Sequence, residues 1–285
     1  MTSIVLFSAV IAGAWFWGGE DVLRLEDEVA FQVHSTVDWS DPGSIALDRY
    51  TRALGLTLEP LARFYEAASG TGTRVDIAVA RDALAAAAAL AAEAAEDAPE
   101  GLAPLERLFA DYLRKAGTML DAWDPAQGLS ASLAETFEAQ HALNDALQDA
   151  TEVRLLRDLR AHETDRGYAY HHRLVHYHGY RAMRAATGAM TTADELRRAL
   201  TDYFDAEVAL QRFLEDRSRI HDGFVPFVEA SANLGKAMAD LVKDMEDEPA
   251  DQWFPRMDAA AVVDAFGDLR AQRHHLLRLE RIGEL

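Results

Sequence analysis

The stretch ALAAAAALAAEAA, residues 83–95, decides the fold class of this chain. Alanine has the highest intrinsic helix propensity of all residues, so an alanine run of this length predicts a helix. The sequence on both sides of this stretch is also expected to be helical, because the prolines fall mostly at segment edges and no stretch alternates apolar and polar residues as strands do. We therefore expect an all-α protein.

Start and stop signals divide the chain into separate helices. Three residue pairs have the spacing of a capping box, and three glycines stand where helices commonly end. They are Thr73 with Asp76, Ser132 with Glu135, Thr192 with Glu195, and Gly70, Gly128 and Gly188. The expected helices span 45–68, 74–96, 102–121, 129–187 with one break, 192–247 with a break near Arg219–Pro226, and 258–282. Short connections favour antiparallel neighbours, so we expect an elongated antiparallel helical bundle.

An uncharged apolar segment, MTSIVLFSAVIAGAWFWGG, opens the chain at residues 1–19. A helix of this length is a candidate for spanning a bilayer core of about 30 Å, and the aromatic residues at 15–17 suit the headgroup layer. The alternatives are a secretory signal with an A-x-A cleavage site at 12–14 and an apolar helix packed on the body of the protein. We expect an N-terminal hydrophobic helix that anchors the chain in the inner membrane with the main domain in the periplasm, or a periplasmic protein if cleavage follows Ala14.

The rest of the chain is expected to form two further parts. A helical bundle domain occupies residues 20–247, and a C-terminal helical extension occupies 248–285. The stretch from Glu248 to Pro255 is the best candidate for a linker between them, because it carries prolines and acidic residues and no helical pattern.

Composition excludes several classes of function. The formal net charge is -20, from 48 acidic and 28 basic residues. Such a surface repels phosphates, so nucleic-acid binding is not expected. The chain has no cysteine, which excludes disulfides, thiolate zinc sites, iron–sulfur clusters, cysteine nucleophiles and a lipid-modified cysteine. The scarcity of lysine among the basic residues and the abundance of alanine are typical of a GC-rich bacterial coding sequence.

One segment stands out chemically, GYAYHHRLVHYHGYRAMR at residues 167–184, with four tyrosines and four of the ten histidines. His172 and His176 lie four residues apart on one helix face, a spacing that can share a metal ion, and Tyr168 and Tyr180 flank them. The two other histidines of the segment point about 120–160° away around the helix. A metal site would need a third ligand from another helix, which the sequence does not identify, so no metal or cofactor is assigned. Packing with hydrogen-bonded His and Tyr tips, and a ligand or partner site, are the alternatives.

A projection of a continuous helix through this region gives one further expectation. Seven residues share a stripe about 60° wide, which is the expected core-facing side. They are Leu156, Leu159, Glu163, Tyr170, Leu174, Tyr177 and Arg181. Glu163 and Arg181 are then charges on an apolar face, and each should find a partner on another helix or reach a polar opening, unless its long side chain extends to the surface. Our hypothesis is that Glu163 is hydrogen-bonded in a polar cluster between helices.

Catalytic and metal motifs are incomplete. The Glu138-x-x-His141 element of di-iron bundles occurs without a second copy, and His162-Glu163 lacks the second histidine of a zinc protease. There is neither a glycine-rich phosphate loop nor a G-x-S-x-G elbow. The His274-His275 pair lies near the C-terminal arginines 270, 273, 278 and 281, and we expect the pair to lie on a solvated helix face. We therefore do not expect an enzyme, although a hydrolase built from dispersed carboxylates and histidines is an alternative.

The order of features in the middle of the chain gives a family resemblance. Tyr112-Leu113-Arg114-Lys115 is followed by Leu129, Phe137 and Asp145, and then by a long helix that carries Glu163, Gly167 and Tyr170. Over roughly 110–245 this order resembles the YiiG-like family of exported bacterial proteins. The resemblance implies a helical exported protein without an established activity, and it transfers no site residues. Members are usually lipid-anchored, whereas this chain has no cysteine to carry a lipid.

The expected function is a non-enzymatic helical binding or interaction module in the bacterial envelope. Its partner would be a protein or a small ligand, with the membrane contacted through the N-terminal segment. The candidate binding residues are Tyr168, His172, His176, Glu163 and Arg181. The alternative is a bundle that binds a metal ion or small ligand through the Tyr/His-rich helix.

Overall fold

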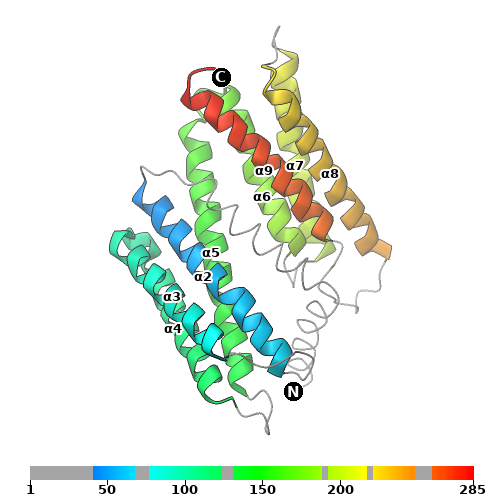
Figure 1. Ribbon diagram of the computed structural model, residues 1–285. Coiled ribbons are helices and arrows are strands. Elements are labelled where there is room, and N and C mark those ends of the chain that lie inside the picture. Colours follow the sequence, from blue (N-terminus) through cyan, green and yellow to red (C-terminus); the bar gives the residue numbers. More distant parts are fainter. Residues whose placement is uncertain (1–40, 69–76, 124–130, 188–191, 217–220, 248–258) are drawn as a thin grey trace. The chain divides into compact units, whose positions relative to one another are not determined.

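The structure is a computed structural model that describes residues 41–68, 77–123, 131–187, 192–216, 221–247 and 259–285. Every secondary-structure element within these ranges is a helix, so the all-α class is confirmed. Consecutive helices pack antiparallel in pairs, as Figure 1 shows. The described chain separates into two compact units after Thr151, and each unit is described by itself.

The first unit contains α2 (Pro42–Ala68), α3 (Ile77–Asp97), the short 3-10 helix η1 (Glu100–Leu102), α4 (Ala103–Asp121) and the first part of α5 (Ala131–Ala161). The alanine run lies in α3, whose buried residues recur every three or four positions. These are Ala80, Leu84, Ala87, Ala91 and Ala94. Because four of the five are alanines, the α3 backbone comes close to α2, its main neighbour. The aromatic residues Tyr50, Phe109 and Tyr112 fill the adjoining core.

The second unit contains the last part of α5, α6 (Tyr168–Thr187), α7 (Ala193–Glu215), α8 (Phe224–Asp247) and α9 (Ala259–Arg281). Helix α6 contacts α7, α8 and α9, so it is the central helix of this unit. Gly179 makes that position possible: a Cβ atom there would lie 3.1 Å from Leu269 of α9 and 3.2 Å from Leu234 of α8. A side chain on α6 at this level would therefore require the side chains of both leucines to shift.

The helix boundaries agree closely with the sequence signals. The expected break in 129–187 lies between α5 and α6, and the break near 219–226 lies between α7, which ends at Glu215, and α8, which begins at Phe224. The capping box of Thr192 and Glu195 is confirmed: the Glu195 backbone N–H donates to Thr192 Oγ1 at 3.2 Å, and the Thr192 N–H donates to the Glu195 carboxylate at 2.8 Å. The box expected at Ser132 is wrong, because α5 has already begun at Ala131.

Several expectations fall on residues outside the described ranges. These are the anchor or signal segment at 1–19, the capping pair Thr73 and Asp76, the glycines at 70, 128 and 188, and the linker at 248–255. None of the described helices is long and apolar enough to cross a membrane. The division into a bundle at 20–247 and an extension at 248–285 stays a prediction; the described part of that extension, α9, packs on α6 and α8.

The core-facing stripe expected for the Tyr/His-rich helix is wrong as a whole: Leu159 and Tyr177 are buried as expected, but Glu163 is exposed and the other members are only partly buried. The projection assumed one continuous helix, but α5 ends at Ala161, and the turn before α6 contains Arg166 with a φ of 42°. Because of this turn, the residues of α6 do not continue the angular order of the residues of α5. The face of α6 that is buried runs instead through His172, Val175, His176, Gly179 and then Ala182, Met183 and Ala186.

Candidate functional site

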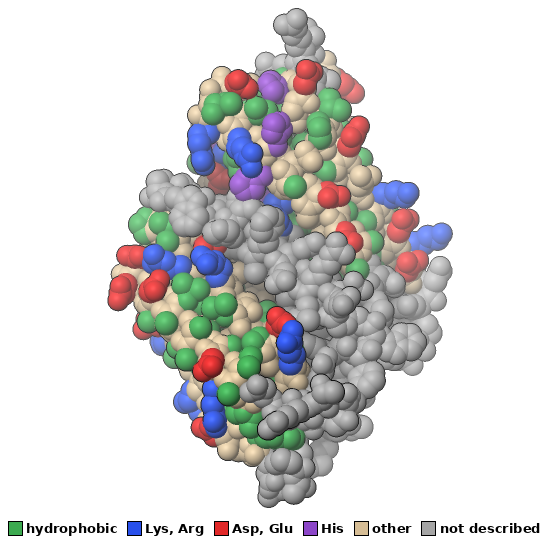
Figure 2. Space-filling model, viewed as in Figure 1, with side chains coloured by type: hydrophobic (Ala, Val, Ile, Leu, Met, Phe, Trp, Pro, Cys, Tyr) green, Lys and Arg blue, Asp and Glu red, His purple; other side chains and the backbone are tan. Residues whose placement is uncertain are grey.

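The buried face of α6 carries the histidines that the sequence singled out. His172 is fully buried and His176 is 2 % exposed, whereas other histidines appear on the molecular surface in Figure 2. Tyr168 and His172 both contact the ring of Phe224, with centroid separations of 4.8 and 6.5 Å. His176 contacts the ring of Phe266 at 5.4 Å. The expectation that Tyr168, His172 and His176 share one face of a helix is therefore confirmed.

Beside these histidines lies a partly buried ion-pair network that joins α5, α6 and α9. Arg173 donates from Nε to Asp158 Oδ1 at 3.0 Å and from Nη1 to the Glu280 carboxylate at 2.9 Å. Arg273 donates from Nη2 to Asp158 Oδ2 at 3.0 Å. One carboxylate of α5 thus accepts from two arginines of different helices, while Glu280 at the end of α9 holds the first of them.

The network controls the charge of its members. Burial alone would raise the pKa of Asp158, but the nearby Arg273 and Arg173 lower it on balance. Glu280 behaves in the same way: burial opposes its ionisation, yet the hydrogen bonds and the positive charge of Arg173 lower its pKa. Both carboxyl groups are therefore ionised at neutral pH and balance the two guanidinium groups.

His172 belongs to the same network as a neutral base. Its Nε2 lies 3.0 Å from Arg173 Nη1 and 3.5 Å from Glu280 Oε1. Burial lowers the pKa of His172 to about 4. Because a guanidinium group only donates, the neutral ring accepts at Nε2 and carries its proton on Nδ1. That Nδ1 has no hydrogen-bond partner among the described residues.

His176 and Arg273 hold further buried nitrogen atoms without partners. Neither ring nitrogen of His176, and neither Nε nor Nη1 of Arg273, makes a hydrogen bond within the described part of the chain. Burial lowers the pKa of His176 well below its usual value, and Arg273, Arg270 and Arg154 lower it further. Burial also lowers the pKa of Arg273, to about 10. His176 is therefore neutral at neutral pH.

Arg181 lies in a separate, partly exposed cluster. It contacts Glu152 of α5 at 3.3 Å and Asp202 of α7 at 3.2 Å, and its guanidinium carbon lies 6.0 Å from the Tyr177 ring centroid. Arg184 also donates to Glu152, at 2.9 Å. The expectation that Arg181 pairs with another helix is confirmed. Its partners lie on α5 and α7, so Arg181 does not belong to the face of α6 that carries His172 and His176.

Glu163 does not lie where the sequence placed it. It is exposed in the turn between α5 and α6, so the hypothesis of a polar cluster between helices around its carboxylate is wrong. The reason is the end of α5 at Ala161, which removes Glu163 from any helix face. Four of the five candidate residues therefore lie on α6, and Glu163 is apart from them.

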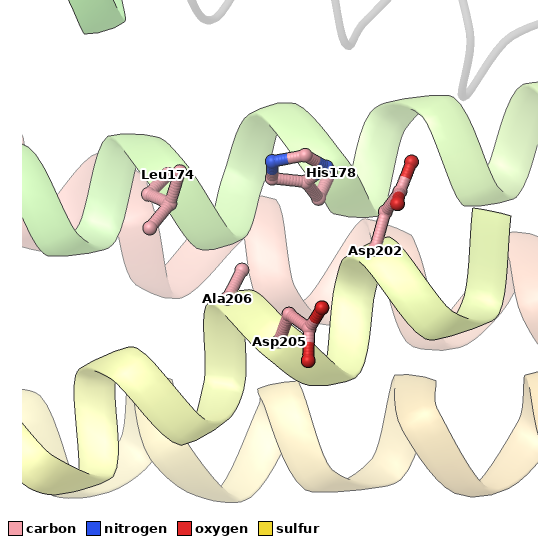
Figure 3. Close-up of a pocket in the computed structure, with 5 residues that line it drawn as sticks. All are labelled: Leu174, His178, Asp202, Asp205 and Ala206. Atoms are coloured by element: carbon pink, nitrogen blue, oxygen red, sulfur yellow. The ribbon is translucent and has the colours of Figure 1, made fainter. Parts of the chain in front are cut away.

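An open pocket lies on the other side of α6, against α7. It has a volume of about 280 Å³ and is lined by Leu174, His178, Asp202, Asp205 and Ala206. Figure 3 shows Leu174 and His178 facing the three α7 residues. Burial lowers the pKa of His178, while Asp202 and Asp205 act to raise it. The His178 Nδ1 atom has no hydrogen-bond partner in the described ranges.

A metal centre is not formed by the side chains that the structure describes: no group of three or more His, Asp or Glu among them could hold a metal ion. Glu280 lies 3.5 Å from His172 Nε2, but Arg173 already occupies its carboxylate. Within the described chain, the third ligand that His172 and His176 would need is therefore not supplied by another helix.

Sequence reasoning missed the charged members of the network. His275 is exposed as expected and His274 is partly buried, but the neighbouring Arg270 and Arg273 are only 4 % and 3 % exposed. One signal was present: residues 151–185 are locally basic in an acidic chain. It shows where arginines gather, but which helices bring carboxylates to them depends on tertiary packing.

No family model, curated protein or solved structure matches this chain.

Proposed function

We propose that this protein is a non-enzymatic helical binding module of the bacterial envelope, and that its second unit takes a small ligand or a side chain of a protein partner in the pocket between α6 and α7. The observation that carries the proposal is the composition of that pocket. Leu174 and Ala206 provide an apolar wall, and His178, Asp202 and Asp205 bring polar groups to one opening. Concave sites of this mixed kind are the usual places for ligands.

The charges of the pocket favour a ligand with a positive or hydrogen-bond-donating group. Asp205 is exposed on α7, and Asp202 retains one contact with Arg181 at 3.2 Å. The neutral His178 offers a ring nitrogen that accepts or donates according to its tautomer. The strongly acidic composition of the chain adds a long-range attraction for cationic partners.

The test is an amide NMR titration of the full chain with a fragment library that includes primary amines. Bound fragments are expected to shift resonances of residues 174–178 and 202–206, and the Asp202→Asn/Asp205→Asn variant should lose these shifts. Asp240→Asn is the matched control, because Asp240 is an exposed acid on α8. Shifts that persist in the double variant, or fragments that bind without preference for this pocket, would refute the proposal.

The second candidate is a metal- or small-ligand site at Tyr168, His172 and His176. It is favoured by the unpartnered ring nitrogens of His176 and of His172, which are free to coordinate or to donate. Metal analysis of untagged protein, compared with a His172→Ala/His176→Ala variant, separates the candidates. Stoichiometric metal that the variant loses would support the second and remove the first.

We also propose the location and outline that the sequence predicts. In this proposal an elongated bundle is held at the inner membrane by an N-terminal hydrophobic helix at residues 1–19, with the main domain in the periplasm, or is released after cleavage behind Ala14. The apolar character of that segment and the resemblance to the exported YiiG-like family support it. Intact-mass measurement on the membrane fraction is the test: a full-length mass supports the anchor, and a mature chain that starts at Trp15 supports cleavage.

A further inference from the structure

Arg181 contacts one of the two carboxylates that line the pocket between α6 and α7. Its Nη1 atom donates to Asp202 Oδ2 at 3.2 Å, and Asp202 is one of the residues that line the pocket. Asp205 lines the same pocket one turn further along α7 and is exposed. The protein therefore supplies a cation of its own to one of the two acids of this opening.

Arg181 is held so that it can leave Asp202 without losing its other contacts. Its Nε atom lies 3.3 Å from Glu152 Oε1, and its guanidinium carbon lies 6.0 Å from the Tyr177 ring centroid. Different nitrogen atoms of one guanidinium group thus hold the two acids. The side chains of Arg181 and Asp202 are 40 % and 47 % exposed, and an ion pair this exposed contributes little free energy. A second cation can therefore replace Arg181 at Asp202 while Glu152 keeps it paired.

The lining of the pocket suits an ammonium group on an alkyl chain. A primary ammonium group has three donors and no acceptor. Asp202 and Asp205 accept hydrogen bonds, and the buried Nδ1 atom of His178 has no hydrogen-bond partner in the described ranges. Leu174 and Ala206 supply the apolar wall that an alkyl chain needs. A metal ion is a poorer match, because no group of three or more His, Asp or Glu in the described chain could hold one.

We propose that the pocket between α6 and α7 binds a primary alkylammonium group, and that Arg181 is the internal competitor which this group displaces from Asp202. Arg181 is then the residue that sets how strongly a ligand must be charged to enter, since a neutral ligand cannot replace it at the carboxylate. The inference rests on the proposed function, because it names the ligand class and the selecting residue of the same pocket.

The experiment titrates the full chain at low ionic strength with two amines, butylamine and Nα-acetyl-lysine methylamide. Butanol, which has the same alkyl chain as butylamine without the charge, is the reference. Amide resonances of residues 174–178 and 202–206 report the binding, and the Nε–H resonance of Arg181 reports the ion pair. We expect saturable binding of at least one amine with a shift of the Arg181 resonance, and no such response to butanol. The relative affinity of the two amines distinguishes a free amine from a lysine side chain as the source of the group.

Variants test the competition directly. Arg181→Gln leaves Asp202 open, so the dissociation constant of the amine should fall about two- to fivefold, as expected for removal of a partly exposed ion pair. Arg184→Gln is the matched control: it also removes one positive charge from α6 and a contact with Glu152, at 2.9 Å, but Arg184 does not line the pocket. It should leave the dissociation constant nearly unchanged. In an Asp202→Asn background, the further change Arg181→Gln should have no effect.

Two results would overturn the proposal. Equal dissociation constants in Arg181→Gln and Arg184→Gln, or a gain that persists in the Asp202→Asn background, would show that Arg181 does not compete. Amines that bind no more tightly than butanol would exclude the ligand class. The proposed function fails in a different way, when fragment shifts survive in the Asp202→Asn/Asp205→Asn variant, so the two failures are distinguishable.

Discussion

Replacing Asp158 by alanine tests the ion-pair network of the second unit most sharply. Arg173 would retain its contacts with Glu280, but Arg273 would lose its only hydrogen bond to the described chain and become an isolated buried cation. Removing one partner of a buried pair typically costs about 3–5 kcal/mol. Because the Asp158 side chain is 32 % exposed, water compensates part of this loss, and we expect the free energy of unfolding to fall by about 2–4 kcal/mol.

The companion variants make this prediction specific. In Arg273→Met the buried charge is gone and Asp158 still holds Arg173, so that variant should be less destabilised than Asp158→Ala. The double variant should likewise be more stable than Asp158→Ala alone, and the double-mutant cycle should give a coupling energy of about 1–3 kcal/mol. Urea unfolding followed by circular dichroism measures all three, with the exposed Glu163→Ala as control, for which a change within about 0.5 kcal/mol is expected. An Asp158→Ala variant as stable as this control would refute the reasoning.

Three further predictions concern charge and backbone geometry. Between pH 6.5 and about 4 His172 is protonated in the unfolded chain but stays neutral in the folded protein, so the free energy of unfolding should fall by up to about 3 kcal/mol over this range. The fall should be smaller in His172→Gln. Urea unfolding at pH 7, 5.5 and 4 measures both. Gly179→Val should lower the free energy of unfolding by about 1–3 kcal/mol, because even a Cβ would lie 3.1 Å from Leu269, and an unchanged Tm would contradict this close approach. Gly283 has a φ of 74° at the end of α9, where the Glu284 N–H donates to the Leu279 carbonyl at 2.9 Å. Gly283→Ala should therefore lower the free energy of unfolding by about 1 kcal/mol in the same urea assay. An unchanged free energy of unfolding would argue against that conformation.

The helices could be predicted because their signals are local. The alanine run at 83–95 lies in α3, and Thr192 with Glu195 begins α7 through the expected pair of hydrogen bonds. Capping and propensity act within one turn, so the sequence contains the whole cause. The box at Ser132 failed because such a spacing also occurs inside helices, as it does in α5.

The orientation of α6 could not be predicted, because its cause is tertiary. The expected stripe depended on a helix that continues past Ala161, and the turn with Arg166 breaks it. The small residue Gly179 then lets three neighbouring helices approach, which buries the face with His172. Periodicity treats histidine as polar and therefore assigns that face to solvent.

The candidate site could be predicted only in part, because the rest of it depends on tertiary packing. Tyr168, His172 and His176 were grouped correctly, since positions four residues apart share a face on any helix. The ion-pair network beside them brings Asp158 from α5 and Arg273 and Glu280 from α9 to Arg173, and no local pattern marks a charge that will be buried. Glu163 was misplaced because the turn moved it off the helix.

The measurement that most directly tests the central claim, a charged network and neutral histidines inside the second unit, is a ¹⁵N spectrum of the histidine side chains of the full chain between pH 5 and 8. The account predicts that His172 and His176 remain neutral at pH 6, with His172 protonated on Nδ1. Titration of both rings near pH 6.5, the value of an exposed histidine, would contradict it.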